Sequence, residues 1–596
     1  MSFFFRWVLL GLVFTLLGFS SLKLDSSSYD VIVVGSEPEG IMAAVAAAEA
    51  GASTLLVSED SRVGGLFVLG EMNSLDLKTD PFNYQQGLFL RWWTMVGKGH
   101  AFDVQEAEKA FLTLLQRSGV TVRLGAGNIE PIMEAGVAKG ISVTSAGLTE
   151  QVRAKQIIDS TSEMTFATKA GANYSFGFSS IGFNARMADT LVFKISGVNW
   201  NKLKAGIQAR GKDYASVDDY VAWGHFGGYP AAYKPQFDNL RLRGLNMGKQ
   251  SDGSLLVNAL LIYGINPFDE ASLAAAKAQA TDEAPRIIDY LKKELPGFEN
   301  AHFGGVAEKL YIRETRHLKG SCTLTVDHIL NNHVSPLDVV AGGYPLDVQT
   351  LTPYDSGYVY GKPDIYGAQL CVTLPDNLEN LWVVGKAASF DPIAASSARV
   401  VPFGMALGEA VGLAASLSAQ RDRSSHGFIA ETQNTLDVRA LLWQRGAYLP
   451  QVEARVPVGP FNSPYYRAYR LMLSRGLAVG GYSNDPNLDK PMPAISYVYL
   501  LSNVGQRFLN NADLGKTIVA SYPDSSVLLN ASLALNITHD TACLAGFCVE
   551  KSWQALLNAG IISESFENRE VLTRGEMYHL AADIAALQPR IAQQQP

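Results

Sequence analysis

The stretch that decides the fold is Tyr29–Asp60, which reads YDVIVVGSEPEGIMAAVAAAEAGASTLLVSED. An apolar run reaches Gly35, and an alanine-rich segment then extends from Gly40 to Gly51. A second apolar run follows and ends at Ser58. The pattern predicts a strand, a tight turn, a helix of small residues and a second strand, which is the βαβ unit of a dinucleotide-binding domain. Such a unit points the N-terminus of its helix at a diphosphate.

Two positions depart from the usual fingerprint of this unit. The spacing G-x-G-x-x-G places a glycine at position 37, where this chain has Glu37. An acidic residue usually closes the second strand, where this chain has Ser58, with Glu59 one place later. A carboxylate at position 37 opposes a diphosphate through its size and its charge. The stretch therefore indicates the function and also questions it.

Length, charge and the first residues limit the class of protein. A chain of 596 residues is expected to form two or three domains. A net charge of −8, without a long basic run, gives no reason to expect nucleic-acid binding. Residues 1–24 contain an early Arg6, an apolar run and a serine-rich exit. They predict either an export signal or a retained membrane anchor, an extracytoplasmic location, and membrane contact only through this segment.

The four cysteines do not have the spacing of a zinc or iron–sulfur site, so no metal centre is expected. Outside the cytoplasm, Cys543 and Cys548 can close a short loop, and a disulfide is favoured there over two free thiols. Cys322 and Cys371 lie in apolar, strand-like segments and are expected to be core residues.

Further segments continue an α/β pattern along the chain. Gly64 and Gly65 open a glycine-bounded segment that is placed to run past a bound cofactor. QIIDSTSE at 156–163 reads as a buried strand that ends in small polar residues, where a doubly wound sheet presents loops to its ligand. A mixed pattern over 173–309, with a helix expected at 271–295, predicts an inserted α+β substrate domain.

Beyond about residue 421 the composition changes, and two weakly similar units appear at 471–501 and 555–584. Each reads as a helix, a glycine-containing turn, a polar loop and a second helix. A repeat of this length suggests a small helical module whose copies stack to bury one face.

Taken in order, the segments of residues 30–419 resemble the FAD-dependent oxidoreductase family with a divergent glutathione-reductase-type FAD domain. The resemblance implies a doubly wound, Rossmann-like FAD-binding domain over 28–172 and 310–420. It places the substrate domain at 173–309 and the flavin ring between the two domains. The segments that carry it are VIVVGSEPEGIMAAVAAAEAG, GGLFVLGEMNSLDL, QIIDSTSE, LPGFENA, YIRETRHLKG and LWVVGKAASFDPIAASSARVVPFGMALGEAVG.

This chain departs from the family at one further cofactor motif. The D-A-T-G-D run of the family is DSTSE here, which places Ser162 at its glycine and Glu163 at its second acid. Serine hydroxyls can donate to a phosphate or a ribose, and Glu59 can turn toward the adenosine.

The C-terminal region, residues 421–596, contains two units that resemble degenerate surface-layer homology modules, which in bacteria commonly bind cell-wall polymers. The second unit carries the better match, through LLNAG and through LTRGE at 572–576. A plain helical cap on the oxidoreductase is the alternative.

The candidate cofactor residues are those that allow close backbone approach or offer N–H groups at a helix start. In the family pattern, Gly385 and Arg399 are expected near the flavin. The alternatives are tight turns without a ligand and a structural arginine. The candidates are Gly35, Ser36, Gly40, Glu59, Gly64, Gly65, Ser162, Gly385, Arg399 and Gly404.

The candidate catalytic residues come from YIRETRHLKG at 311–320. Either Arg313 or Arg316 could hold a substrate carboxylate, and His317 could transfer a proton. A Glu314–Arg316 network that only joins the domains is the alternative.

We therefore expect an exported or membrane-anchored FAD-dependent oxidoreductase that transfers a hydride or an electron pair between a small organic substrate and flavin. The alternative is a cofactor-less, flavoprotein-derived envelope protein with a binding or structural role at the cell wall.

Overall fold

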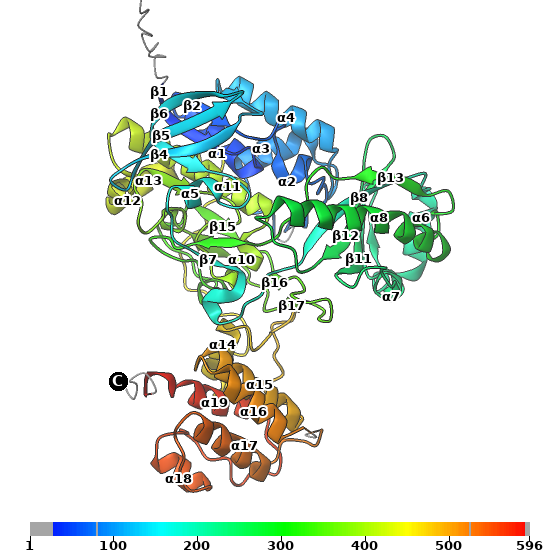
Figure 1. Cartoon of the computed structure of the whole chain (residues 1–596), viewed down its shortest axis with the longest axis vertical. Coiled ribbons are helices and arrows are strands. Elements are labelled where there is room, and N and C mark those ends of the chain that lie inside the picture. The colour runs from blue at the N-terminus through cyan, green and yellow to red at the C-terminus, as the bar shows by residue number, and fades with distance from the viewer. Residues whose placement is uncertain (1–27, 79–80, 524–525, 591–596) are drawn as a thin grey trace, which may run out of the picture.

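The computed structural model describes residues 28–78, 81–523 and 526–590, so the predicted export or anchor segment at 1–24 lies outside the described residues. Figure 1 shows an α/β domain at the top, a second sheet domain beside it and a helical module below.

The first domain is built on a seven-stranded sheet in the order β3-β2-β1-β6-β5-β4, with β19 also paired with β6. The pairs of β1 with β2, of β2 with β3, and of β6 with β1 and β19 are parallel, whereas β4 and β5 continue the sheet as antiparallel strands. The α/β, doubly wound fold class is confirmed. The strands are β1 (Ser28–Val34), β2 (Thr54–Val57), β3 (Thr121–Arg123), β4 (Asn128–Glu134), β5 (Val137–Ser145), β6 (Leu148–Asp159) and β19 (Leu381–Val383).

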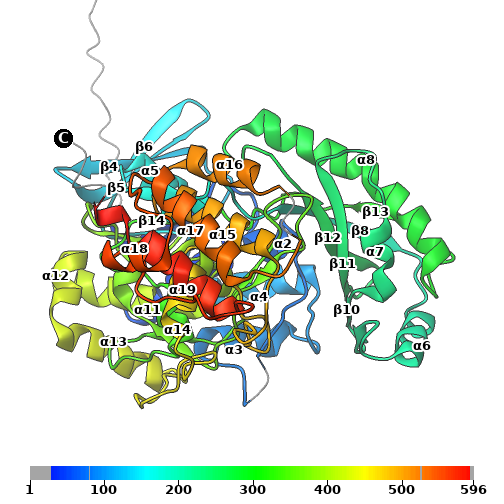
Figure 2. The same ribbon diagram turned by 90° about the horizontal axis from the view of Figure 1, so that it is seen from below.

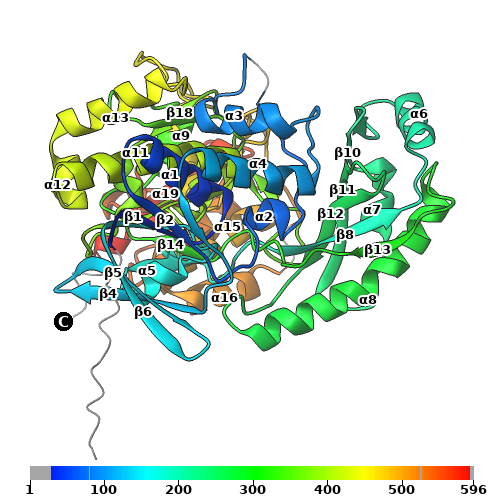
Figure 3. The same ribbon diagram turned by 90° about the horizontal axis from the view of Figure 1, so that it is seen from above.

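Two helices of small residues pack closely against each other beside this sheet (Figure 3). They are α1 (Pro38–Glu49) and α11 (Val401–Gln420). Gly408 and Gly412 of α11 lie against the backbone carbonyls of Glu39 and Ala43, with no room for a Cβ atom. Among the described residues, α11 is the one helix long and apolar enough to cross a membrane, and it is buried in the core. The other helices of this domain are α2 (Gly65–Val68), α3 (Gly87–Val96), α4 (Val104–Arg117), α5 (Thr165–Lys169), α9 (Val326–Leu330) and α10 (Pro392–Ala398).

The second domain has a six-stranded antiparallel sheet in the order β13-β8-β12-β11-β10-β9. The long helix α8 (Glu270–Glu294) packs along it, close to the helix predicted at 271–295 (Figure 3). All six strands lie within the range predicted for the inserted domain. They are β8 (Asp189–Ser196), β9 (Ser216–Val217), β10 (Val221–Gly224), β11 (Leu240–Lys249), β12 (Leu255–Ile262) and β13 (His302–Val306), accompanied by α6 (Trp200–Arg210) and α7 (Tyr229–Ala232).

In its described residues the C-terminal module contains three helix pairs, where the sequence predicted two units. Figure 2 shows these helices next to one another. The additional pair, α16 and α17, lies between the two predicted units. The loops of the three pairs meet: Leu529 donates its N–H to the Met492 carbonyl, and Leu572 donates to the Leu529 carbonyl. The helices are α14 (Tyr466–Ser474), α15 (Ala494–Arg507), α16 (Ala512–Ser521), α17 (Ala531–Leu544), α18 (Trp553–Asn558) and α19 (Arg574–Ala585).

Helices α12 (Ser425–Ala430) and α13 (Thr432–Gln444) contact α11. The next helix along the chain is α14, which begins at Tyr466.

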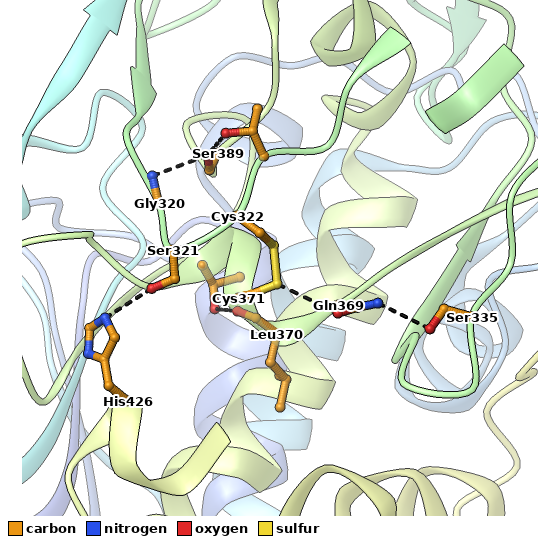
Figure 4. Close-up of a disulfide and its surroundings, with 11 residues drawn as sticks. Gly320, Ser321, Cys322, Ser335, Gln369, Leu370, Cys371, Ser389 and His426 are labelled. Carbon is orange, nitrogen blue, oxygen red and sulfur yellow. Dashed lines mark hydrogen bonds between the residues drawn. A yellow bond between two sulfur atoms is a disulfide. The ribbon is translucent and has the colours of Figure 1, made fainter. Parts of the chain in front are cut away.

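Both cysteine pairs form disulfides. Cys543–Cys548 closes the short loop that the sequence predicted. Cys322 and Cys371, which were expected to be core residues, are half-buried and form a disulfide that the sequence did not predict (Figure 4). The backbone explains the pairing: Ser321 donates its N–H to the Leu374 carbonyl at 2.9 Å, which places two segments distant in sequence side by side.

Candidate functional site

Two cavities meet at the N-terminus of α1. The larger, of about 370 Å³, lies between the first domain and α8 of the second domain. The smaller, of about 220 Å³, lies among the loops that follow β1, β2 and β6. Both are lined by Glu37, the 160–163 loop and Lys309, so together they form one elongated site at the carboxyl ends of the parallel strands.

Most of the predicted cofactor residues line these cavities. The residues on the walls are Gly35, Ser36, Glu59, Gly65, Ser162, Gly385 and Arg399. The other three act in packing: Gly40 faces Ser160, Gly64 faces Val68 and Phe111, and Gly404 lies where a Cβ would be 2.6 Å from Glu39 Cγ.

The smaller cavity is lined by Ser58, the second position at which this chain departs from the usual fingerprint. Ser36 Oγ donates to Ser58 Oγ at 3.1 Å, so two hydroxyls replace the usual acid at this point. Glu59 accepts the Ile129 N–H at 3.3 Å and lines the same cavity. Polar groups that can bind a ribose are therefore present, although the usual acid is not at its usual position.

Glu37 lies where the two cavities meet. It is the N-cap residue of α1, but its side chain does not cap that helix. Instead, the carboxylate accepts the Leu66 N–H at 2.9 Å. This hydrogen bond links the loop before α1 to helix α2. Burial raises the pKa of Glu37, and the positive charges of Lys309 and Lys386 oppose this shift.

A second acid, Glu39, lies two residues further along the chain, in the first turn of α1, and lines the larger cavity. Its side chain is buried, and burial together with the negative charge of Glu37 raises its pKa to about 8. Glu39 therefore holds a proton at neutral pH. Glu39 was not among the residues predicted from the sequence, although an acid between Gly35 and Gly40 was a visible signal.

A cluster of polar groups follows β6 and β19. Lys386 Nζ lies 2.8 Å from Glu163 Oε1 and 3.1 Å from Ser162 Oγ. Asp159 supports this loop, because it accepts the N–H groups of Thr161 and Ala167 at 2.7 Å. Lys386 brings a cation to the centre of the site, and the sequence analysis did not identify it.

The three predicted catalytic residues do not line either of the two cavities, although Arg316 contacts Glu163, which lines both. Arg313 donates to the Ala188 carbonyl, to Thr190 and to Asn258. Arg316 donates to the Glu163 carbonyl at 2.7 Å and stacks over Phe268. His317 is buried, with Nε2 2.9 Å from Glu314 Oε1. These contacts join chain segments, as the alternative of a purely structural network predicts. Glu314, however, pairs with His317 and not with Arg316. The catalytic assignment stays a prediction.

Arg399 and Tyr311 form the better placed pair of chemical groups. Arg399 lines the larger cavity and donates to Tyr311 Oη at 3.0 Å, and its buried Nε has no hydrogen-bond partner within the described residues. Burial raises the pKa of Tyr311, but the charges of Arg399 and Arg313 outweigh this effect and lower it. The pair can bind an anionic group and exchange a proton. Tyr311 belongs to the quoted 311–320 segment but was not among the predicted residues.

The residues present fit an elongated dinucleotide. A Cβ atom at Gly35 would lie 2.5 Å from the Ser160 carbonyl oxygen, so the turn before α1 requires glycine and remains tight. Lys309, Lys386 and Arg399 supply positive charge along the site. The Glu37 carboxylate at the junction is the feature that opposes a diphosphate.

Comparisons with known proteins give one family and several distant relatives. The model of the family described as FAD dependent oxidoreductase matches residues 30–436. Digeranylgeranylglycerophospholipid reductase of Methanosphaerula palustris is 26% identical over 151 residues, which cover 22% of this chain and 38% of that protein. This match therefore spans less than half of that relative.

Two solved structures are also similar. A geranylgeranyl bacteriochlorophyll reductase-like protein from Thermoplasma acidophilum is 15% identical, covering 70% of this chain and 84% of that one, with a TM-score of 0.38. A flavoprotein/dehydrogenase from Cytophaga hutchinsonii is 13% identical, covering 83% and 100%, with a TM-score of 0.36.

Proposed function

Because this chain belongs to the FAD dependent oxidoreductase family, whose model matches residues 30–436, we propose that it oxidises or reduces a small organic substrate in the larger cavity. FAD is the cofactor that this family uses, and when bound it accepts or supplies a hydride or an electron pair.

The observation that carries the proposal is the position and lining of the larger cavity. It lies between the first domain and α8 of the second domain, and it shares Glu37 and Lys309 with the smaller cavity. Sites of this kind favour ligands that are mostly apolar, with a few polar groups fixing their orientation. The apolar part of the wall comes from Leu66, Pro267, Leu273, Ala274, Leu310 and Ile312.

The charged residues of the wall suggest the character of the substrate. Lys277 and Arg399 both line the larger cavity. In the described part of the chain, Arg399 donates to Tyr311 Oη and to the Asp347 carbonyl and to no carboxylate, so it is available for an anionic group of the substrate. Tyr311 accepts a hydrogen bond from Arg399 and so holds this guanidinium at the cavity wall.

Residues of the smaller cavity would hold the adenosine half of FAD. Ser58 and Glu59 supply polar groups for a ribose, and Ser36 and Ser162 supply hydroxyls for the diphosphate. Lys309 and Lys386 supply positive charge at the junction.

The visible spectrum tests the proposal. The purified full-length protein should show flavin absorbance near ~450 nm after incubation with FAD and removal of the excess. A protein that never retains flavin would contradict the proposal and would favour a cofactor-less envelope protein, for which the carboxylate at position 37 is the supporting observation.

An extracytoplasmic location is also part of the proposal. It is supported by the signal-like segment at 1–24 and by the two disulfides, since stable disulfides are typical of oxidising compartments. The three helix pairs of the C-terminal module could bind a cell-wall polymer. Cosedimentation of the protein with purified cell walls tests this binding, and a variant that ends before Tyr466 should lose it.

A further inference from the structure

Glu37 directly precedes helix α1, and it lines both cavities. It is held there by the Leu66 N–H at 2.9 Å, and it lies against Gly65 so closely that a Cβ atom on that glycine would collide with it. A negatively charged oxygen that accepts a backbone N–H between two glycine loops has the chemistry of a bound phosphate oxygen.

We propose that Glu37 is an internal substitute for a phosphate group, and that FAD binds by displacing the Glu37 carboxylate from Leu66 N–H while the Glu37–Glu39 pair takes up a proton. The proposal rests on the assignment of FAD as the cofactor. The proposal concerns how this protein binds FAD, which its membership of the family does not determine.

The charges around Glu37 explain why a proton must be taken up. Glu37 faces Lys309 and Lys386, and also the acids Asp60 and Glu39. Both lysines are already paired, Lys309 with Asp60 and Lys386 with Glu163 at 2.8 Å. A diphosphate that enters beside these groups would therefore find no unpaired cation at the junction.

The linings of the two cavities contain six acidic and five basic side chains, so with Glu39 protonated the site has no excess of positive charge for a diphosphate. The acids are Glu37, Glu39, Glu59, Asp60, Glu163 and Glu308, and the bases are Lys169, Lys277, Lys309, Lys386 and Arg399. Two further negative charges would be unfavourable in a partly buried site unless an acid becomes neutral. Glu37 and Glu39 are the acids that burial already favours in the neutral form.

The proposal predicts the pH dependence of cofactor affinity. FAD affinity of the full-length protein should fall as pH rises above about 8, the pKa of Glu39, by up to about tenfold per pH unit, which corresponds to one proton taken up per FAD. Fluorescence titration with FAD measures the affinity. Calorimetry in two buffers with different ionisation enthalpies measures the proton directly and needs no variant.

Three substitutions separate Glu37 from the general charge of the site. Glu37→Gln keeps a carbonyl that can accept Leu66 N–H but removes the charge, so it should bind FAD more tightly and with a weaker pH dependence. Glu37→Gly restores the glycine of the fingerprint at a backbone conformation open to any residue, and should bind more tightly still. Glu308→Gln is the matched control, because Glu308 lines the same cavity with an exposed side chain, and it should keep the pH dependence of the unaltered protein.

The outcomes distinguish this proposal from the assignment of the cofactor. If the unaltered protein binds FAD without proton uptake, or if the two Glu37 variants bind no more tightly than it does, the displacement proposal is wrong and the cofactor assignment stands. If neither the unaltered protein nor any folded variant binds FAD at any pH, both are wrong. Thermal unfolding of each variant confirms that it is folded.

Discussion

Glu39 carries a buried carboxyl group near Gly385 and Gly404, and its protonation links the site to the stability of the fold. Its pKa is about 8 in the folded protein, against 4.5 as the reference value for an unfolded chain. Between these values the folded state binds more protons than the unfolded state. The free energy of unfolding should therefore fall as pH rises from about 4.5 to about 8, by up to about 1.4 kcal/mol per pH unit.

Glu39→Gln removes this dependence, because the amide does not ionise. Relative to the unaltered protein, the variant should gain stability progressively between about pH 5 and about pH 8 and gain no more above that. Urea unfolding at a series of pH values measures the difference. The exposed acid Glu308, changed to Gln, is the control and should leave the curve unchanged. Parallel curves for Glu39→Gln and the unaltered protein would show that Glu39 is ionised in the fold.

The sequence predicted much of the site at this scale because cofactor contacts follow local motifs. Glycines at fixed spacing and the polar end of β6 can be read directly, and seven of the ten predicted positions line the cavities. Lys386 and Tyr311 could not be found in the same way. Their roles depend on neighbours from distant segments, such as Glu163 for the lysine and Arg399 for the tyrosine.

At the scale of elements, α1 and α11 place the glycine loop against the second half of the first domain. Gly408 allows this contact, because its α-carbon lies against the Glu39 carbonyl. Gly408→Val should force the helices apart and lower the free energy of unfolding by about 3 kcal/mol. Ala406→Val, at a half-buried position of the same helix, is the control and should have a much smaller effect. Equal stabilities of the two variants, measured by urea unfolding, would contradict the close packing.

Elements with a strong local pattern were predicted well, and those defined by distant pairing were not. The βαβ unit and the helix α8 have clear apolar periodicity, and the structure confirms both. The α16–α17 pair was missed because its loop lacks the glycine turn that marks the other two pairs. Its place becomes visible only through the hydrogen bonds that join its loop, at Leu529, to Met492 and Leu572.

At the scale of the whole molecule, the two disulfides connect stability with the proposed compartment. Cys322–Cys371 closes a loop of 49 residues, and Cys543–Cys548 closes one of five. In the chain-entropy model these loops correspond to about 4 and about 2 kcal/mol of stabilisation.

Replacing Cys322 and Cys371 with serine should therefore lower the unfolding free energy about twice as much as replacing Cys543 and Cys548. Urea unfolding with and without a reducing agent measures both effects, and each double variant should lose the corresponding part of its sensitivity to the reductant. If the protein isolated from its native cells instead carries four thiols that react with an alkylating agent before reduction, the disulfides do not form there, and the extracytoplasmic location loses its structural support.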